Sequence, residues 1–212
     1  MTEEEAKGWI EANFNVPRET LARLEAFADF LRSENERQNL VSRGTLDRIW
    51  ERHFLDSAQL LRFVPASDAS WLDLGTGAGF PGLVVAALHG GPVTMIESRR
   101  LRVEFLRRAA DVLGLGDRAV ILLDRVERVP TQKFDVISAR AFAPMNELLE
   151  LAHRFSTEKA RWILPKGRSA QSELAAAESS WQGSFRLEPS LTDAESGIII
   201  ADAVRPRGRK RA

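Results

Sequence analysis

Apolar residues in the first third of the chain recur every three or four positions, which is the spacing of an amphipathic helix. Leu21, Leu24 and Leu31 follow this rhythm, and Pro17 just ahead of them suits a helix start. A second run of the same kind stops at Pro65. The pattern predicts an N-terminal helical extension packed on the core, residues 1–66, with helices over 18–38 and 45–64.

From Ser70 the pattern changes to short apolar runs that alternate with helical stretches. Alternation of this kind produces right-handed crossovers and a parallel sheet with helices on both faces. The last two runs are separated only by the turn TDAES, so they predict an antiparallel hairpin at one edge. The expected strands are 71–75, 92–98, 119–124, 134–140, 160–167, 184–191 and 197–204, and the expected helices are 80–89, 101–114, 144–155 and 170–181.

These elements indicate one α/β domain, residues 67–204, built on a doubly wound, mostly parallel Rossmann-like sheet. The chain has 212 residues, which is enough for this domain and the extension to bury a sizeable core. The basic stretch after the domain, residues 205–212, predicts a disordered tail.

The segment LDLGTGAGFPG, residues 72–82, places a glycine-rich loop between the first strand and its helix. Gly75 and Gly77 allow a tight turn, and Gly79 allows a ligand to approach the backbone closely. Pro81 suits the start of a helix whose free N–H groups face a ligand. The loop predicts a nucleotide-type cofactor, and glycines that serve only a strand-to-helix turn are the structural alternative.

Two carboxylates narrow the choice of cofactor. Asp73 lies inside the strand before the loop, where it accepts hydrogen bonds either from loop amides or from the ammonium group of an amino acid. Glu97 ends the second strand, at the place where an acid binds both hydroxyls of an adenosine ribose. No phosphate-binding lysine follows the loop, which excludes a P-loop. S-adenosylmethionine is therefore favoured, and a nicotinamide dinucleotide comes second because Asp73 would repel its pyrophosphate.

Basic residues are concentrated in one segment although the net charge is zero. Residues 99–108, RRLRVEFLRR, carry five arginines against one glutamate. Arg99, Arg100 and Arg102 open a helix just past Glu97, where cations oppose the helix dipole and an anionic partner would offset that cost. These three residues predict contacts with RNA phosphates, against the alternative of a solvated helix face.

Composition excludes several other classes of function. The chain has no cysteine, which removes disulfides, cysteine-ligated zinc and thiolate nucleophiles. With three histidines in the whole chain, no metal site is expected. No apolar run approaches a membrane span, and the N-terminus is acidic rather than signal-like, so a cytoplasmic protein without membrane contacts is expected.

Six segments carry a family resemblance: RHFLDS (52–57), LDLGTGAGFPG (72–82), RRLRVEFLR (99–107), RVERV (125–129), SARAF (138–142) and LPKG (164–167). In this order and spacing they resemble the bacterial small-subunit ribosomal RNA guanine-N7 methyltransferase family, RsmG, also called glucose-inhibited division protein B. The resemblance covers about residues 25–204. It implies a class I methyltransferase fold, S-adenosylmethionine as cofactor, and small-subunit ribosomal RNA or the 30S particle as partner. A monomer is expected.

The resemblance also assigns positions in the cofactor site. It implies that Gly75 contacts the methyl donor through its backbone and that Phe80 packs on it. It implies further that Val126 and Glu127 flank the adenine. The residues alone would select Asp124 for the adenine, because Asp124 ends its strand directly.

Arg140 and Lys166 are the expected substrate-positioning residues. Arg140 ends the fourth strand, where the resemblance implies that it closes the cofactor site toward the substrate. Both would contact guanine O6 or a phosphate, because N7 must stay open for attack. A surface salt bridge for Arg140 and a turn role for Lys166 are the structural alternatives. His53, which shares a predicted helix with Asp56, either faces RNA or braces the extension against the core.

Methylation at guanine N7 agrees with the absence of an obvious catalytic dyad. The N7 lone pair is free at neutral pH, so in-line attack needs no general base, and positioning alone can supply roughly 7–11 kcal/mol. The segment SARAFAP (138–144) lacks the Asn/Asp-Pro-Pro motif of exocyclic-amine methyltransferases. A looped or flipped-out guanine is the expected target. An NAD(P)-dependent oxidoreductase and an RNA-binding protein with a vestigial cofactor pocket are the two alternatives.

Overall fold

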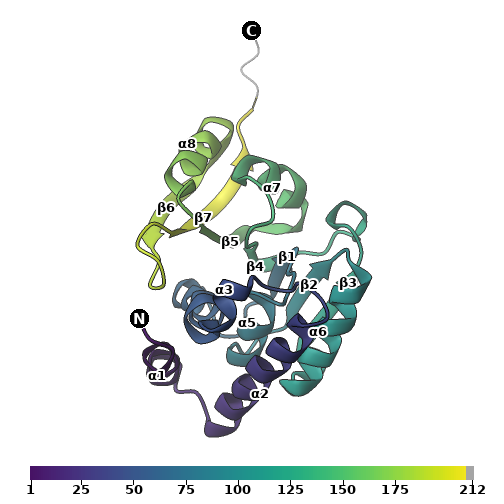
Figure 1. The fold of residues 1–212 in the computed structure, drawn as a ribbon. Coiled ribbons are helices and arrows are strands. Elements are labelled where there is room, and N and C mark those ends of the chain that lie inside the picture. The colour runs from purple at the N-terminus through teal and green to yellow at the C-terminus, as the bar shows by residue number, and fades with distance from the viewer. Residues whose placement is uncertain (209–212) are drawn as a thin grey trace.

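Residues 1–208 are described by a computed structural model, in which seven strands form one sheet (Figure 1). The strand order is β3-β2-β1-β4-β5-β7-β6. Strands β1 to β5 pair in parallel, whereas β7 runs antiparallel to both β5 and β6. The predicted mostly parallel sheet with an antiparallel pair at one edge is confirmed. The strands are β1 (Trp71–Leu74), β2 (Val93–Glu97), β3 (Ala119–Leu123), β4 (Phe134–Ser138), β5 (Ser156–Lys166), β6 (Trp181–Pro189) and β7 (Gly197–Pro206).

Both faces of the sheet are covered, because apolar side chains alternate between two cores along the central strands. In β1, Trp71 packs into the first core and Leu72 into the second, and in β7 Ile199 belongs to the second core while its two neighbours belong to the first. Helices α5 and α6 cover the first core, and α7 and α8 cover the second (Figure 1). None of the helices within residues 1–208 has the length and apolar character needed to cross a membrane. Their bounds are α5 (Gly82–Leu88), α6 (Arg100–Val112), α7 (Met145–Ala152) and α8 (Ala170–Ser180), with short 3-10 turns η3 (Gly116–Arg118), η4 (Val126–Arg128) and η5 (His153–Phe155).

The N-terminal helices share the first core with the sheet and have no separate core of their own. Phe27 stacks on Phe54 with 5.5 Å between ring centroids. Its ring also lies 5.9 Å from Phe80 of the glycine loop and 6.5 Å from Phe105 of α6. This aromatic cluster holds the extension against the start of the sheet domain. The helices are α1 (Glu3–Phe14), α2 (Arg18–Asn35) and α3 (Arg43–Leu46).

The single helix predicted over 45–64 is wrong. After α3, the chain forms the π-helical turn η1 (Trp50–Leu55), the short α4 (Asp56–Ala58) and the 3-10 turn η2 (Gln59–Phe63). The Glu3 carboxylate of α1 accepts hydrogen bonds from the backbone N–H groups of Trp50, at 2.9 Å, and Glu51, at 3.1 Å. A side-chain acceptor for these N–H groups lets a new helical segment start at this point, as a helix cap does.

Helix α2 ends at Asn35 rather than at residue 38. The Asn35 Oδ1 atom accepts hydrogen bonds from the backbone N–H groups of Leu40 and Val41, both at 2.9 Å. Asparagine side chains compete with the helix for backbone groups in this way, and the result here is a turn.

The last strand continues past the predicted domain boundary at residue 204. Strand β7 reaches Pro206, and Arg205 lies opposite Gln182 of β6. The antiparallel partner strand therefore orders the first residues of the predicted tail. The predicted disorder at 209–212 lies outside the described residues.

Candidate functional site

The carboxyl ends of β2, β1 and β4 lie side by side, and the glycine-rich loop leaves β1 at this edge. The backbone N–H of Gly75 donates to the carbonyl of Ile96 in β2, at 2.9 Å, which holds the loop over the end of its neighbour. Gly75 and Gly79 adopt φ angles of 62° and 88°, which L-residues with a Cβ rarely adopt. In an open α/β sheet, ligands bind in the crevice outside this edge.

A first pocket, the glycine-loop pocket, has a volume of about 490 Å³. Residues at or just past the carboxyl ends of four strands, β1 to β4, contribute to its wall. The predicted cofactor residues Gly75, Glu97, Val126 and Glu127 all line it, together with Asp124 and Phe142. The same pocket thus contains both predicted adenine contacts, Asp124 at the end of its strand and Val126 with Glu127 in η4.

Glu97 is buried and organises the floor of this pocket. Its Oε2 accepts from the backbone N–H of Gly77 at 3.1 Å, and its Oε1 accepts from the backbone N–H of Arg99 at 2.8 Å. Arg102 Nη1 lies 3.8 Å from the same carboxylate. A carboxylate has about four acceptor positions, so Glu97 retains the capacity to bind further donors such as a pair of hydroxyls.

Asp73 does not line the pocket wall but lies beneath the loop, with no exposed surface. Its Oδ2 accepts from the backbone N–H of Gly82 at 3.0 Å, and its Oδ1 accepts from the Ser138 hydroxyl at 2.7 Å. Burial raises the pKa of Asp73 to about 6, although these hydrogen bonds work in the opposite direction. Of the two roles that the sequence left open for Asp73, the structure shows the bond to a backbone amide.

Phe80, which the resemblance places on the cofactor, is buried and does not line the glycine-loop pocket. It stacks against His53 with 4.8 Å between ring centroids, and the guanidinium of Arg140 lies 5.2 Å above it. The ring also lies 5.9 Å from Phe27 and thus faces the N-terminal extension. Phe80 therefore supports a second pocket rather than the first.

This second pocket, the arginine pocket, has a volume of about 580 Å³. It combines cations and carboxylates in three ion pairs. They are Arg140 with Asp56 at 3.2 Å, Lys166 with Glu173 at 2.7 Å, and Arg52 with Asp193 at 3.6 Å.

Arg140 is held from several directions at the end of β4. Its Nη1 donates to the carbonyl of Arg52 at 3.3 Å and to Asp56 Oδ2 at 3.2 Å. Its Nη2 donates to His53 Nδ1 at 3.3 Å. These hydrogen bonds and the contact with the Phe80 ring fix the orientation of the guanidinium. In this orientation Arg140 lines the arginine pocket.

His53 braces Arg140 and the extension. Burial, with the neighbouring charges of Arg140 and Arg52, lowers the pKa of His53 to about 3, so the ring is neutral. Because Nδ1 accepts from Arg140, the ring proton belongs on Nε2, which lies 2.9 Å from Thr45 Oγ1. Both nitrogens are thus engaged. Of the two expected roles, these contacts correspond to the brace.

Lys166 is largely buried, and its ammonium group is engaged on two sides. It donates to the carbonyl of Ala143 at 2.9 Å and pairs with Glu173, whose other contacts include the backbone N–H of Met145 at 2.9 Å. These contacts tie the end of β5 to the loop that precedes α7. Lys166 lines the arginine pocket, as expected for a residue near the substrate.

The three arginines near Glu97 do open α6, as predicted, but their surroundings differ. Arg102 is paired with Glu97 and only about a quarter of its side chain is exposed. Arg100 is exposed and pairs with Glu104 one turn further along, at 3.2 Å. Arg99 is exposed at the N-cap of the helix. Arg99 and Arg100 are therefore the two that present charge to solvent.

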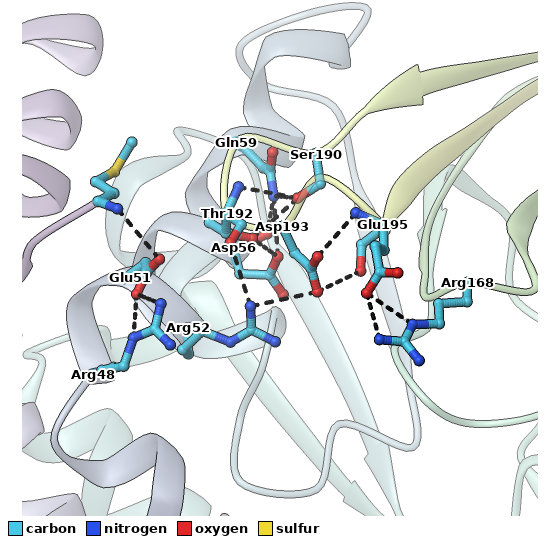
Figure 2. Close-up of polar contacts among 12 residues, drawn as sticks. Arg48, Glu51, Arg52, Asp56, Gln59, Arg168, Ser190, Thr192, Asp193 and Glu195 are labelled. Carbon is cyan, nitrogen blue, oxygen red and sulfur yellow. Dashed lines mark hydrogen bonds and ion pairs between the residues drawn. The ribbon is translucent and has the colours of Figure 1, made fainter.

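The hairpin loop between β6 and β7, residues 190–196, completes the arginine pocket from the other end of the chain. Figure 2 shows its contacts with the N-terminal extension. The Thr192 hydroxyl donates to Asp56 Oδ1 at 2.8 Å, and Gln59 accepts from the backbone N–H of Leu191 at 2.9 Å. Arg52 donates to the carbonyl of Thr192 at 3.3 Å. The loop thus forms one continuous wall with the segment that runs from η1 through α4 to η2.

Two kinds of residue in this site are not among those predicted from the sequence. The hairpin-loop residues Thr192 and Asp193 carry no local motif, and only the pairing of β7 with β5 brings them to the pocket. Phe142, in contrast, follows Arg140 directly after β4, and an aromatic residue at that place was a signal within the SARAF segment.

Known proteins resemble this chain over nearly its whole length. Residues 20–195 match a family model described as rRNA small subunit methyltransferase G. A protein called ribosomal RNA small subunit methyltransferase G from Rhizorhabdus wittichii is 52% identical over 211 residues, which are 99% of this chain and 96% of the relative. One of the same name from Zymomonas mobilis is 46% identical, covering 99% of this chain and 98% of the relative.

Solved structures share the fold. An O-methyltransferase from Bacillus cereus in complex with SAH has a TM-score of 0.57 at 18% identity, covering 84% of this chain and 90% of that one. A SAM-dependent methyltransferase from Aquifex aeolicus has a TM-score of 0.56 at 17% identity, covering 69% and 88%. These matches confirm the predicted class I methyltransferase fold.

Replacing Asp73 tests the buried carboxylate through its pH dependence. The pKa of Asp73 in the folded protein, about 6, lies above its ordinary value of 3.8, so the folded state binds this proton more tightly. The contribution of Asp73 to stability is therefore greatest below about pH 4 and is lost as the pH rises through 6. The unfolding free energy of the parent should fall relative to Asp73→Asn across this range, by about 3 kcal/mol. Urea titrations at a series of pH values measure this difference.

The matched control is Asp117→Asn, since Asp117 is exposed in η3. Its unfolding free energy should follow that of the parent at every pH. Parallel pH curves for the parent and Asp73→Asn would show that Asp73 is ionised as readily as an exposed carboxyl.

Proposed function

The chain belongs to the rRNA small subunit methyltransferase G family, and on this premise we propose that it transfers a methyl group from S-adenosylmethionine to N7 of a guanine in small-subunit ribosomal RNA. One observation carries the proposal. The glycine-loop pocket and the arginine pocket meet at a common wall, Phe142 and Ala143. A methyl donor in the first pocket would face an RNA base in the second.

The residues of the glycine-loop pocket fit an adenosyl cofactor. The Glu97 carboxylate at the end of β2 suits the two ribose hydroxyls. The buried apolar side chain of Val126, with Glu127 beside it, suits the face and edge of an adenine. The backbone at Gly75 lets a ligand come close. When bound, the cofactor would supply an electrophilic methyl carbon and depart as a neutral thioether.

Guanine N7 needs no proton removed before it reacts. Its lone pair would form the new bond to the methyl carbon while the carbon–sulfur electron pair returns to sulfur, and no proton is transferred. The task left to the protein is to hold the reacting atoms in line at about 3–3.5 Å. This agrees with a site in which His53 is neutral and held between two partners and therefore unsuited to act as a base.

The charges of the arginine pocket suit both the substrate and the product. Arg140 and Lys166 would donate to guanine O6 or to a phosphate of the flipped nucleotide. Methylation at N7 makes the purine cationic, and the pocket contains the carboxylates of Asp56, Glu173 and Asp193 to stabilise that charge. The ion pairs of this pocket have no net charge, and they thus provide cations for the substrate and carboxylates for the cationic product.

One copy of the chain supplies all of these groups, which supports a monomer as the active form. The N-terminal extension, residues 1–66, contributes Arg52, His53 and Asp56 to the wall, so we infer that it belongs to the substrate site and packs on the core, residues 67–204. A ribosomal RNA substrate supports an activity in the cytoplasm. Family membership does not favour the NAD(P)-dependent oxidoreductase.

The direct test is methyl transfer. The protein, S-adenosylmethionine with a labelled methyl group, and either small-subunit ribosomal RNA or 30S particles should give label that nucleoside analysis finds as 7-methylguanosine. Large-subunit ribosomal RNA is the control and should stay unlabelled. Label in another nucleoside would contradict the N7 assignment, and cofactor binding without transfer to any RNA would indicate a vestigial pocket.

Glu97→Gln tests the cofactor site by a binding measurement. Loss of charge from the carboxylate weakens its hydrogen bonds to the ribose hydroxyls, so calorimetry should find the affinity for S-adenosylhomocysteine lowered by about 10-fold or more. Glu104→Gln is the control, because Glu104 is an exposed glutamate on α6, the helix that follows Glu97 in the chain. Its affinity should equal that of the parent. Equal affinities for Glu97→Gln and the parent would remove Glu97 from the proposed site.

Exchanging Arg99 and Arg100 for alanine tests the RNA contacts. Removal of each arginine–phosphate interaction should reduce the slope of log affinity against log salt by about 0.7–0.9. Filter binding of small-subunit RNA between low and moderate salt gives this slope. Arg205→Ala is the control. Because β7 runs antiparallel to β5, Arg205 lies where the parallel strands begin, whereas Arg99 and Arg100 lie where they end. An unchanged slope in the double variant would assign these arginines to a merely solvated helix face.

A further inference from the structure

Phe142 stands between the two pockets. It lines both of them, and a Cβ atom built on Gly75 would come within 2.3 Å of its Cδ2 and 3.0 Å of its Cε2. The ring therefore rests directly on the bare backbone of the first loop glycine. Elsewhere it is only partly buried, at the margin of the second core.

A ring in this position would obstruct the proposed transfer. A methyl carbon in the glycine-loop pocket and a nucleophile in the arginine pocket must come to about 3–3.5 Å. An aromatic ring in contact with Gly75 fills part of the space through which they would meet. For the proposed transfer, the ring would therefore have to leave Gly75 before or while the cofactor and the base are brought together.

The segment around Phe142 has one strained residue between two fixed points. Arg140 is fixed by its contacts with Arg52, His53 and Asp56, and the carbonyl of Ala143 is fixed by Lys166. Between them, Ala141 is exposed and has a φ of 51°, in the left-handed region that alanine populates sparsely. A return of Ala141 to an ordinary backbone conformation would move the Phe142 ring and leave Arg140 in place.

We propose that the Phe142 ring is a movable partition between the glycine-loop pocket and the arginine pocket, and that it also holds the target base. This inference rests on the proposed function. In this structure the ring covers Gly75. When the cofactor occupies the glycine-loop pocket, the ring turns toward the arginine pocket and stacks on the guanine. Stacking on an aromatic side chain is the usual way in which a protein holds an unpaired base. The partition thus links cofactor binding to the formation of the base site.

Fluorine NMR tests the movement of the ring without any need for activity. The eleven phenylalanines are replaced by 4-fluorophenylalanine, and the Phe142 signal is identified by its absence in Phe142→Leu. Saturating S-adenosylhomocysteine should shift the Phe142 signal. The signal of Phe185, a residue of β6 at the margin of the same core, should stay unchanged. A Phe142 signal that does not shift, in a sample that binds S-adenosylhomocysteine by calorimetry, would overturn the partition alone. Absence of binding heat would overturn the cofactor site itself, and the partition with it.

Kinetics of variants test the stacking. Phe142→Leu should keep the affinity for S-adenosylhomocysteine or increase it, because the ring no longer has to be displaced. Its kcat/KM for small-subunit RNA should fall by about 10-fold or more, the effect of removing one base–aromatic stack. Phe142→Trp retains an aromatic face and should restore most of that activity, and Phe185→Leu is the matched control with parent-like kinetics. Parent-like kcat/KM in Phe142→Leu would overturn the base-holding role.

Discussion

The buried carboxylate of Asp73 connects the parts on which the site depends. A carboxylate without solvent contact is costly unless donors satisfy it, and here the donors come from the Ser138 hydroxyl on β4 and from the first backbone N–H of α5. Trp71 of β1 in turn donates to the same hydroxyl, at 2.8 Å. Because these bonds are directional, they set the two central strands and the helix in one relative position. The glycine loop between them is then held over the end of β2, where Glu97 binds its backbone.

Arg140 plays the corresponding part on the side of the arginine pocket. A half-buried guanidinium is stabilised here by a carboxylate, a carbonyl, a neutral imidazole and an aromatic face. Those partners come from η1, from α4 and from the glycine loop, and the hairpin loop in turn holds Asp56 of α4. Segments that are far apart in the chain are thus joined around one cation. The extension and the hairpin loop therefore both contribute residues to the wall of the arginine pocket.

The two pockets differ in a way that suits a reaction without proton transfer. The glycine-loop pocket combines the bare backbone of Gly75 with the carboxylates of several acidic residues and with apolar side chains such as Val126 and Phe142. In the arginine pocket cations and carboxylates are already paired, so it accommodates a neutral base and a cationic product with little change in the surroundings. Phe142 lies where the two environments meet, and its movement would decide when they become one site.

The amino-acid sequence by itself determined the alternation of strands and helices, the glycine loop, and the acid at the end of β2. These are local features, because side-chain periodicity and turn residues act within a few positions. The sequence did not determine the interruption of the helix over 45–64, because the acceptor that starts η1 is Glu3, which lies in a different helix. Nor did it determine which side chains face a pocket. Phe80 and Asp73 lie buried, His53 binds Arg140, and Thr192 reaches Asp56, since each of these orientations follows from a contact between distant segments. Only the tertiary structure brings such partners to hydrogen-bond distance, and it alone places Phe142 on Gly75.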